Sequence, residues 1–154
     1  MLPPDGLCDL LFYTDVWFLD QDFHGRNNAK SWKVFVQAAP GFRRTGFGIS
    51  ASYREVHSMR EALADAGREE LLKLYRENIR HHGILRVTGT STSLKMDISG
   101  RLELIKDLKA FQEEASASSP VETTPELVLG IRFTNYLDKG EVSHHPSTLS
   151  EITR

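Results

Sequence analysis

The sequence predicts an α/β protein, a single domain whose mostly parallel sheet has helices on both faces. Short apolar segments alternate along the chain with segments whose apolar residues recur at helical spacing. The last apolar segment, residues 127–133, is apolar nearly throughout, as in strands covered on both sides. We therefore expect one α/β domain over residues 7–140 and a flexible tail over residues 141–154.

The composition of the chain limits the classes of protein to which it can belong. The chain has 154 residues and a formal net charge of -2, from 19 basic and 21 acidic residues. That charge makes no long-range field that would gather nucleic acid, so we expect no nucleic-acid partner. Cys8 is the lone cysteine, which excludes an intrachain disulfide and predicts a reducing, cytoplasmic location.

Membrane insertion is not predicted. No apolar run approaches the roughly 18 to 20 residues that a transmembrane helix needs. The first residues, MLPPDG, have neither the basic nor the apolar region of a signal peptide. We therefore expect no transmembrane segment, although the chain could still make peripheral contact with a membrane surface.

The first predicted strand lies within residues 7–19, where aromatic residues and leucines dominate. Strands usually run about 5 to 6 residues, so we expect an interruption at Thr14 and Asp15, with residues 16–19 as the central piece. Residues 20–28 are polar and contain a glycine, which predicts a loop. Asn27 or Asn28 is suited to cap the helix that follows.

Residues 29–39 admit two interpretations. As a helix, the segment places Trp32, Phe35 and Val36 on one side; as a strand, it alternates and forms a hairpin with residues 47–53. We favour the helix, because its alanines are good helix formers and Pro40 with Gly41 ends a helix.

The rest of the chain continues the alternation. Residues 55–81 have helical spacing with a bend, or two abutting helices, at Gly67, and Gly83 is suited to a left-handed cap at the end of that helix. Ser99 can cap a helix over residues 100–114, and residues 115–125 predict a flexible connection. The remaining predicted strands are residues 47–53, 84–88 and 127–133.

In parallel sheets, ligands bind beyond the carboxyl ends of the strands, which directs attention to four loops. The first loop, residues 20–28, contains Asp20, Asp22, His24, Arg26 and Asn27. Its carboxylates could hold Mg²⁺, and its arginine could hold an oxyanion. Capping of the following helix by itself explains the same residue types, and we favour that interpretation.

The other three loops offer weaker signals. Ser50 and Arg54, in residues 50–54, are suitable for phosphate oxygens, although an ordinary helix entry also explains them. Residues 89–93, GTSTS, could present amides and hydroxyls to an anion but lack the lysine of a P-loop. Residues 134–139 contain Asn135 and Tyr136, and a turn accounts for them.

Several other chemistries are not indicated. The six histidines lack the spacing of a zinc site, and neither a G-x-S-x-G nor a G-x-G-x-x-G motif is present. The pair Arg43 and Arg44 is too short for nucleic acid and predicts an exposed turn.

The order of these loops resembles the cis-prenyltransferase family, of the undecaprenyl diphosphate synthase type. The segments that carry the resemblance are VWFLDQD, HGRNNA, FGISASYR, ENIRHHGILRVTG and LVLGIRFTNY. Asp20 is similar to the family's aspartate that assists magnesium and diphosphate, with Asp22 as the alternate. Thr90 stands where the family's third strand ends in an aspartate, which predicts a divergent or shortened member.

The resemblance implies a protein that binds, and could process, a prenyl diphosphate with Mg²⁺. Asp20 would be catalytic and would hold the metal with Asp22. The implied substrate-binding residues are Arg26, Asn27, Ser50, Arg54 and Asn135. The alternative is a non-catalytic interaction module or inactive subunit of the same fold, whose aromatic N-terminal region pairs with another chain in a homo- or hetero-dimer.

Overall fold

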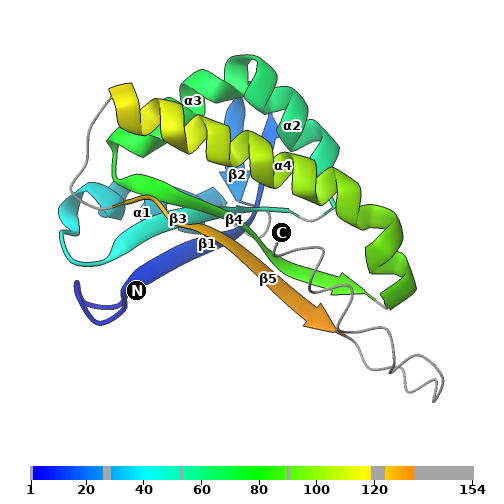
Figure 1. Ribbon diagram of the computed structural model, residues 1–154. Helices are drawn as coiled ribbons and strands as arrows, with labels where there is room; N and C mark the ends of the chain where they lie inside the picture. Colours follow the sequence, from blue (N-terminus) through cyan, green and yellow to red (C-terminus); the bar gives the residue numbers. More distant parts are fainter. Residues whose placement is uncertain (1, 26–28, 53, 90, 119–123, 134–154) are drawn as a thin grey trace.

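The computed structural model describes residues 2–25, 29–52, 54–89, 91–118 and 124–133. Ten elements follow one another along these residues (Figure 1). They are β1 (Leu10–Leu19), β2 (Asp22–Gly25), α1 (Ala29–Ala38), the 3₁₀ helix η1 (Ala39–Gly41), β3 (Gly46–Ala51), α2 (Val56–Ala64), α3 (Ala66–Arg76), β4 (Ile79–Gly89), α4 (Ser91–Ser118) and β5 (Leu127–Phe133).

The five strands form one sheet in the order β2-β1-β3-β4-β5. The β1–β2 pair is antiparallel, whereas the other three pairs are parallel. From β1 to β5 each crossover adds its strand on the same side of the previous one. Right-handed crossovers that always proceed in one direction place every connecting helix on the same face of the sheet.

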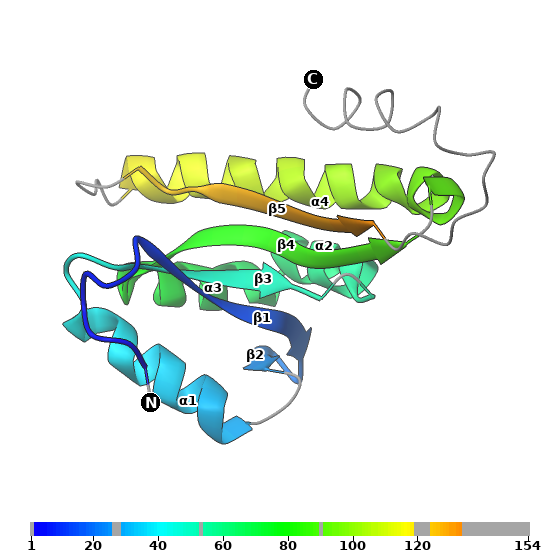
Figure 2. The same ribbon diagram turned by 90° about the horizontal axis from the view of Figure 1, so that it is seen from below.

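Side-chain packing shows this one-sided arrangement. Tyr13, Ile49 and His82 pair in register across β1, β3 and β4, so their side chains share a face. Tyr13 packs on α1 through Trp32, and His82 packs on α4 through Phe111. Figure 2, which views the molecule from below, shows α2, α3 and α4 together behind the sheet.

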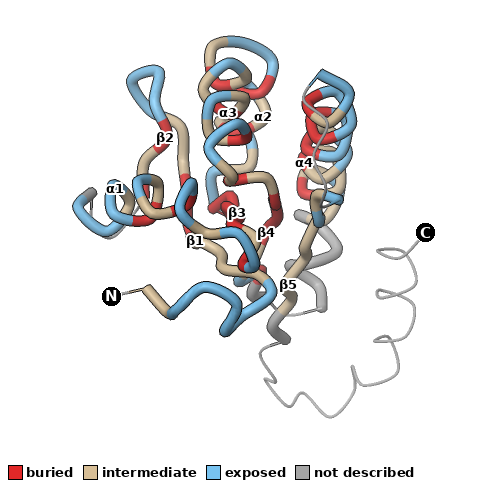
Figure 3. Tube along the Cα trace, turned by 90° about the vertical axis from the view of Figure 1, so that its left-hand side faces the viewer, coloured by how far each residue is buried: buried red, intermediate tan, exposed pale blue. Residues whose placement is uncertain are grey.

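The hydrophobic core lies between the sheet and this helical layer, as the buried segments in Figure 3 show. Phe47 of β3 packs against Phe35 of α1, and Tyr75 of α3 packs edge-on against Phe111 of α4. The first ring contact joins α1 to β3, and the second joins α3 to α4. The largest fully buried side chains include Tyr75, Phe23, Phe47, Phe111 and Leu71.

Large side chains that lie over glycines line the other face of the sheet. A Cβ atom on Gly48 would lie 2.6 Å from the Phe12 ring, and one on Gly130 would lie 3.0 Å from a Leu85 methyl group. The ring of His81 likewise lies over Gly46. Side chains of β1 and β4 therefore fill the positions that glycines of β3 and β5 leave open, and the outer face is partly covered without a helix.

The structure confirms the predicted α/β class with its mostly parallel sheet, which the antiparallel β2 makes mixed. It also confirms the helix over residues 29–39 and the strand over residues 127–133. The predicted interruption of the first strand is a bulge: the register shifts between Tyr13 and Val16, and Asp15 has φ 57°. The predicted break near Gly67 separates α2 from α3 at Asp65.

Four expectations are wrong. The helices cover one face of the sheet because the strand order never reverses. Residues 22–25, predicted as loop, form β2, which completes a hairpin with β1. The helix predicted to reach residue 81 ends at Arg76, and Asn78, with φ 73°, takes the left-handed position assigned to Gly83. The last helix begins at Ser91, ahead of Ser99.

Gly83 has a different role from the predicted helix cap. It lies within β4, where an added Cβ atom would be 2.2 Å from the backbone oxygen of Val128 in β5. We predict that Gly83→Ala lowers the free energy of unfolding by about 1–3 kcal/mol, because β4 and β5 must separate to admit the methyl group. Urea denaturation measures the loss.

Gly41→Ala is the matched control, because a Cβ atom there meets nothing within 4 Å. We expect its unfolding midpoint to stay close to that of the parent protein. Equal stability of the two variants would contradict the close approach of the strands at Gly83.

Candidate functional site

Asp20 and Asp22 lie at the tip of the β1–β2 hairpin. Leu19 pairs with Asp22, and the two residues between them, Asp20 and Gln21, have φ 50° and 64°. Positive φ at both central positions is typical of the tight turn that joins two antiparallel strands. The pairing of β1 with β3 ends at Val16, so Asp20 lies about 13 Å farther along the strand, at 3.3 Å per residue.

The Ser50 hydroxyl forms its hydrogen bonds with backbone groups. The Ser50 side chain is fully buried, its hydroxyl accepts a hydrogen bond from the Leu85 amide at 2.7 Å, and it donates to the Ala51 carbonyl. The hydroxyl thus joins β3 to β4. Arg54 is exposed just before α2, while Arg26, Asn27 and Asn135 lie outside the described residues. The structure therefore does not bring the predicted site residues together within its described part.

An ion pair lies toward the carboxyl ends of the strands, where the sequence predicted a ligand site. Arg86 Nη1 donates to Asp15 Oδ2 at 2.7 Å, and the Asp15 side chain is 6% exposed. Both residues have positive φ at bulges, one in β1 and one in β4. Because β3 lies between these strands, the pair spans β3 and ties the two bulges together.

Metal ligands do not gather in the described part of the chain. Among those residues, no three His, Cys, Asp or Glu side chains stand close enough to hold a metal ion. No described helix combines the length and apolar character needed to cross a bilayer. The predicted Mg²⁺ site at Asp20 and Asp22 stays a prediction.

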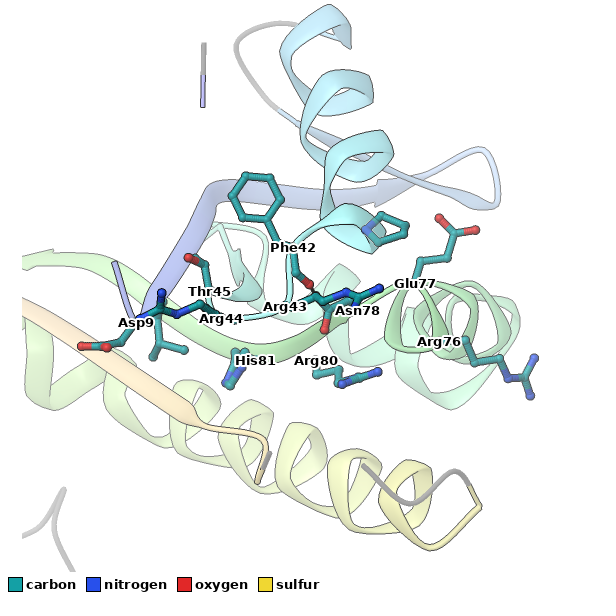
Figure 4. Close-up of a pocket in the computed structure, with 13 residues that line it drawn as sticks. Asp9, Phe42, Arg43, Arg44, Thr45, Arg76, Glu77, Asn78, Arg80 and His81 are labelled. Carbon is teal, nitrogen blue, oxygen red and sulfur yellow. Dashed lines mark hydrogen bonds between the residues drawn. The ribbon is translucent and has the colours of Figure 1, made fainter. Parts of the chain in front are cut away.

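A pocket lies at the opposite, amino-terminal edge of the sheet (Figure 4). It has a volume of about 560 Å³, within the range of small-molecule sites. The loop before β3 and the junction between α3 and β4 form most of its wall. The charged and titratable lining residues are Asp9, Arg43, Arg44, Arg76, Glu77, Arg80 and His81.

The lining is cationic. Four arginines and two carboxylates give it a formal charge of +2 with His81 neutral, in a chain whose net charge is -2. Within the described part of the chain, none of these four guanidinium groups forms an ion pair, whereas Arg60, Arg68 and Arg86 each pair with a carboxylate. The pocket thus concentrates positive charge that no described side chain neutralises.

The four arginines differ in how they are held. Arg80 Nε donates to the Tyr75 carbonyl at 3.4 Å, so this side chain also caps the end of α3. Arg76 points away from the others in Figure 4, while Arg43 extends toward Asn78 and Glu77. The Arg44 guanidinium packs on Gly6, where a Cβ atom would lie 3.0 Å from Arg44 Nε. Arg43 and Arg80 are therefore the guanidinium groups best placed to meet a ligand in the pocket.

Asp5 fixes the loop that carries Arg43 and Arg44. Its carboxylate accepts hydrogen bonds from the backbone amides of Arg43, Arg44 and Thr45, each at 2.9 Å. These amide hydrogen bonds hold the pKa of Asp5 below its usual value. The Thr45 hydroxyl accepts a further hydrogen bond from the Gly6 amide at 2.8 Å, so the N-terminal segment clamps this loop.

His81 contributes a hydrogen-bond donor to the pocket. Its Nδ1 accepts a hydrogen bond from the Glu126 amide at 2.9 Å, so the proton of the neutral ring is on Nε2. Nε2 lies over Gly46, where a Cβ atom would be only 2.3 Å away. Burial, with a smaller contribution from the Arg80 charge, lowers the pKa of His81 and keeps the ring neutral.

His82 points to the other side of the sheet. The Gln112 amide nitrogen lies 3.0 Å from its Nδ1 and also donates to the carbonyls of Arg80 and Glu126. Burial lowers the pKa of His82 to about 3, with the neighbouring His81 as a second cause. The two adjacent histidines thus face different environments, and both are neutral at pH 7.

Sequence reasoning missed this pocket because it examined only the carboxyl ends of the strands. Arg43 and Arg44 precede β3, and Arg76 and Arg80 flank the start of β4. Adjacent parallel strands begin at the same edge of a sheet, so two arginine pairs in equivalent positions before two such strands are the signal that could have found it.

Comparison with known proteins finds no family model, no curated protein and no solved structure that matches this chain. The resemblance to cis-prenyltransferases stays a prediction.

Asp5 provides a test of the clamp. We predict that Asp5→Ala increases hydrogen exchange at the amides of Arg43, Arg44 and Thr45, because three donors lose their acceptor. Asp9→Ala is the control, since it removes a nearby carboxylate of the same pocket. Equal protection of the three amides in Asp5→Ala and the parent protein would contradict the clamp.

The buried histidines predict a loss of stability in acid. Below the unfolded pKa of about 6.5, the unfolded chain takes up a proton at His82 and the folded chain does not until about pH 3. We therefore expect the free energy of unfolding to fall by about 2 kcal/mol between pH 7 and pH 5 through His82.

Urea denaturation at both pH values measures this loss. His82→Gln should show a shallower pH dependence than the parent protein, whereas His57→Gln, at an exposed histidine, should retain the parent slope. If all three proteins share one slope, His82 is not the buried neutral group described above.

Proposed function

We propose that the protein binds a small anionic molecule in the pocket at the amino-terminal edge of the sheet. The observation that carries this proposal is the set of four arginines around one pocket, none paired with a described carboxylate. Arg43, Arg44 and Arg76 are exposed and Arg80 is half-buried, so an anion entering the pocket could reach guanidinium donors that no described carboxylate occupies.

Phosphate oxygens suit this lining. A guanidinium group presents parallel N–H donors that match a phosphate or carboxylate in a two-point contact. Arg43 and Arg80 come from different segments, and His81 Nε2 adds a neutral donor over Gly46. A ligand with several anionic oxygens, such as a diphosphate, could engage all three at once.

A prenyl diphosphate, predicted from the family resemblance, belongs to this class of ligand, and we retain it with Mg²⁺ as a proposal. In this proposal the diphosphate is held at the amino-terminal edge and not by Ser50, whose hydroxyl is already bonded to backbone groups. We also retain the cytoplasmic location, because Cys8 is a free and exposed thiol, which suits a reducing compartment.

Calorimetric titration tests the proposal with inorganic pyrophosphate, citrate and geranyl diphosphate, each with and without Mg²⁺. We expect the parent protein to bind pyrophosphate, and Arg43→Gln with Arg80→Gln to weaken binding at least tenfold, because each substitution removes a charged donor from the pocket. Citrate separates a general preference for anions from a preference for phosphate.

Lys109→Gln removes one positive charge from an exposed position of α4, outside the pocket, and should leave the affinity unchanged. Circular dichroism confirms that each variant is folded. If no anion binds the folded parent protein, or if the double variant binds as tightly as Lys109→Gln, the pocket is not an anion site.

A further inference from the structure

A second cavity adjoins the arginine-lined pocket. It has a volume of about 490 Å³ and lies between α1 and α3, with Asp22 of β2 at its border. Glu77 lines both cavities. The chain also passes from one to the other twice: from Gln37 to Pro40 at the end of α1, and from Leu74 to Arg76 at the end of α3.

The second cavity differs in character from the first. Trp32, Val36 and Leu74 are partly buried and contribute apolar surface to it. Its charged residues, Asp22, Glu70 and Glu77 with Lys33 and Lys73, give a formal charge of -1. Lys73 forms an ion pair with Glu70, and that hydrogen bond raises the pKa of Lys73. The apolar surface between α1 and α3 is therefore available to a ligand, whereas the net positive charge lies in the adjoining arginine-lined pocket.

Resting on the anion-binding function proposed above, we infer that the ligand is an amphiphile. Its anionic head would lie between Arg43 and Arg80, and an apolar chain or ring would pass Glu77 and lie on Trp32, Val36 and Leu74. Burying an apolar chain on this surface adds affinity that a free anion cannot gain. The adjoining cavities thus define a ligand class narrower than small anions in general.

A matched pair of phosphate esters tests this inference. Methyl phosphate and n-octyl phosphate have the same head and differ only in the apolar chain. We expect octyl phosphate to bind the parent protein at least tenfold more tightly in calorimetric titration. Val36→Gln should abolish most of this difference while leaving the affinity for methyl phosphate unchanged.

Val34→Gln is the control, because Val34 belongs to the same helix but is 48% exposed and does not line the cavity. Tryptophan fluorescence provides a local measurement in a Trp17→Phe background, where Trp32 is the single tryptophan. Octyl phosphate should shift the Trp32 emission, and methyl phosphate should not.

The outcomes separate the two proposals. Equal affinities for the two esters, or equal effects of Val36→Gln and Val34→Gln, would overturn the amphiphile and leave the anion site standing. If the folded parent protein binds neither these esters nor pyrophosphate, the anion site fails and the amphiphile fails with it.

Discussion

The structure depends on the handedness of its strand connections. Each crossover from β1 to β5 adds the next strand on the same side, so right-handed connections place all four helices on one face. The other face receives no helix from the described chain. Side chains of β1 and β4, such as Phe12 and Leu85, lie instead over glycines of the neighbouring strands and shield part of that face.

The same connections bring positive charge to one edge of the sheet. Helices α1 and α3 both end where the chain returns to the amino-terminal edge, ahead of β3 and β4. The carbonyl ends of helices attract cations, and Arg80 donates to such a carbonyl. Arg43 lies on the loop held by Asp5, and its guanidinium has no such partner among the described residues, so its charge remains available to the pocket.

Strand β4 joins this edge to the core. Its adjacent histidines alternate across the sheet, with His81 over Gly46 at the pocket and His82 against Phe111 of α4. The Glu126 amide donates to the His81 ring, and the Glu126 carbonyl accepts a hydrogen bond from the His82 backbone amide. The segment entering β5 therefore helps orient the pocket-facing ring of His81. A change that loosens β5 would therefore alter the orientation of His81 in the pocket.

The sequence by itself predicted the apolar strand β5 and an irregularity at Asp15, and it favoured a helix over a strand for the segment with Trp32 and Phe35. These features depend on residues close in the chain, where helical spacing, apolar runs and turn residues act directly. Local pattern was misleading at Gly83, because a glycine suits a helix cap and a close strand approach equally well. The contact with Val128, which selects the second role, lies far along the chain.

Only the tertiary structure decided which loops face one another. The candidate residues predicted at the carboxyl edge are separated by the β1–β2 hairpin, which carries Asp20 beyond the end of the β1–β3 pairing. Arg43 and Arg80 meet at the amino-terminal edge because β3 and β4 are parallel neighbours. The sequence shows the residue types at each loop, but the order of strands sets their distances, and that order follows from the packing of the whole chain.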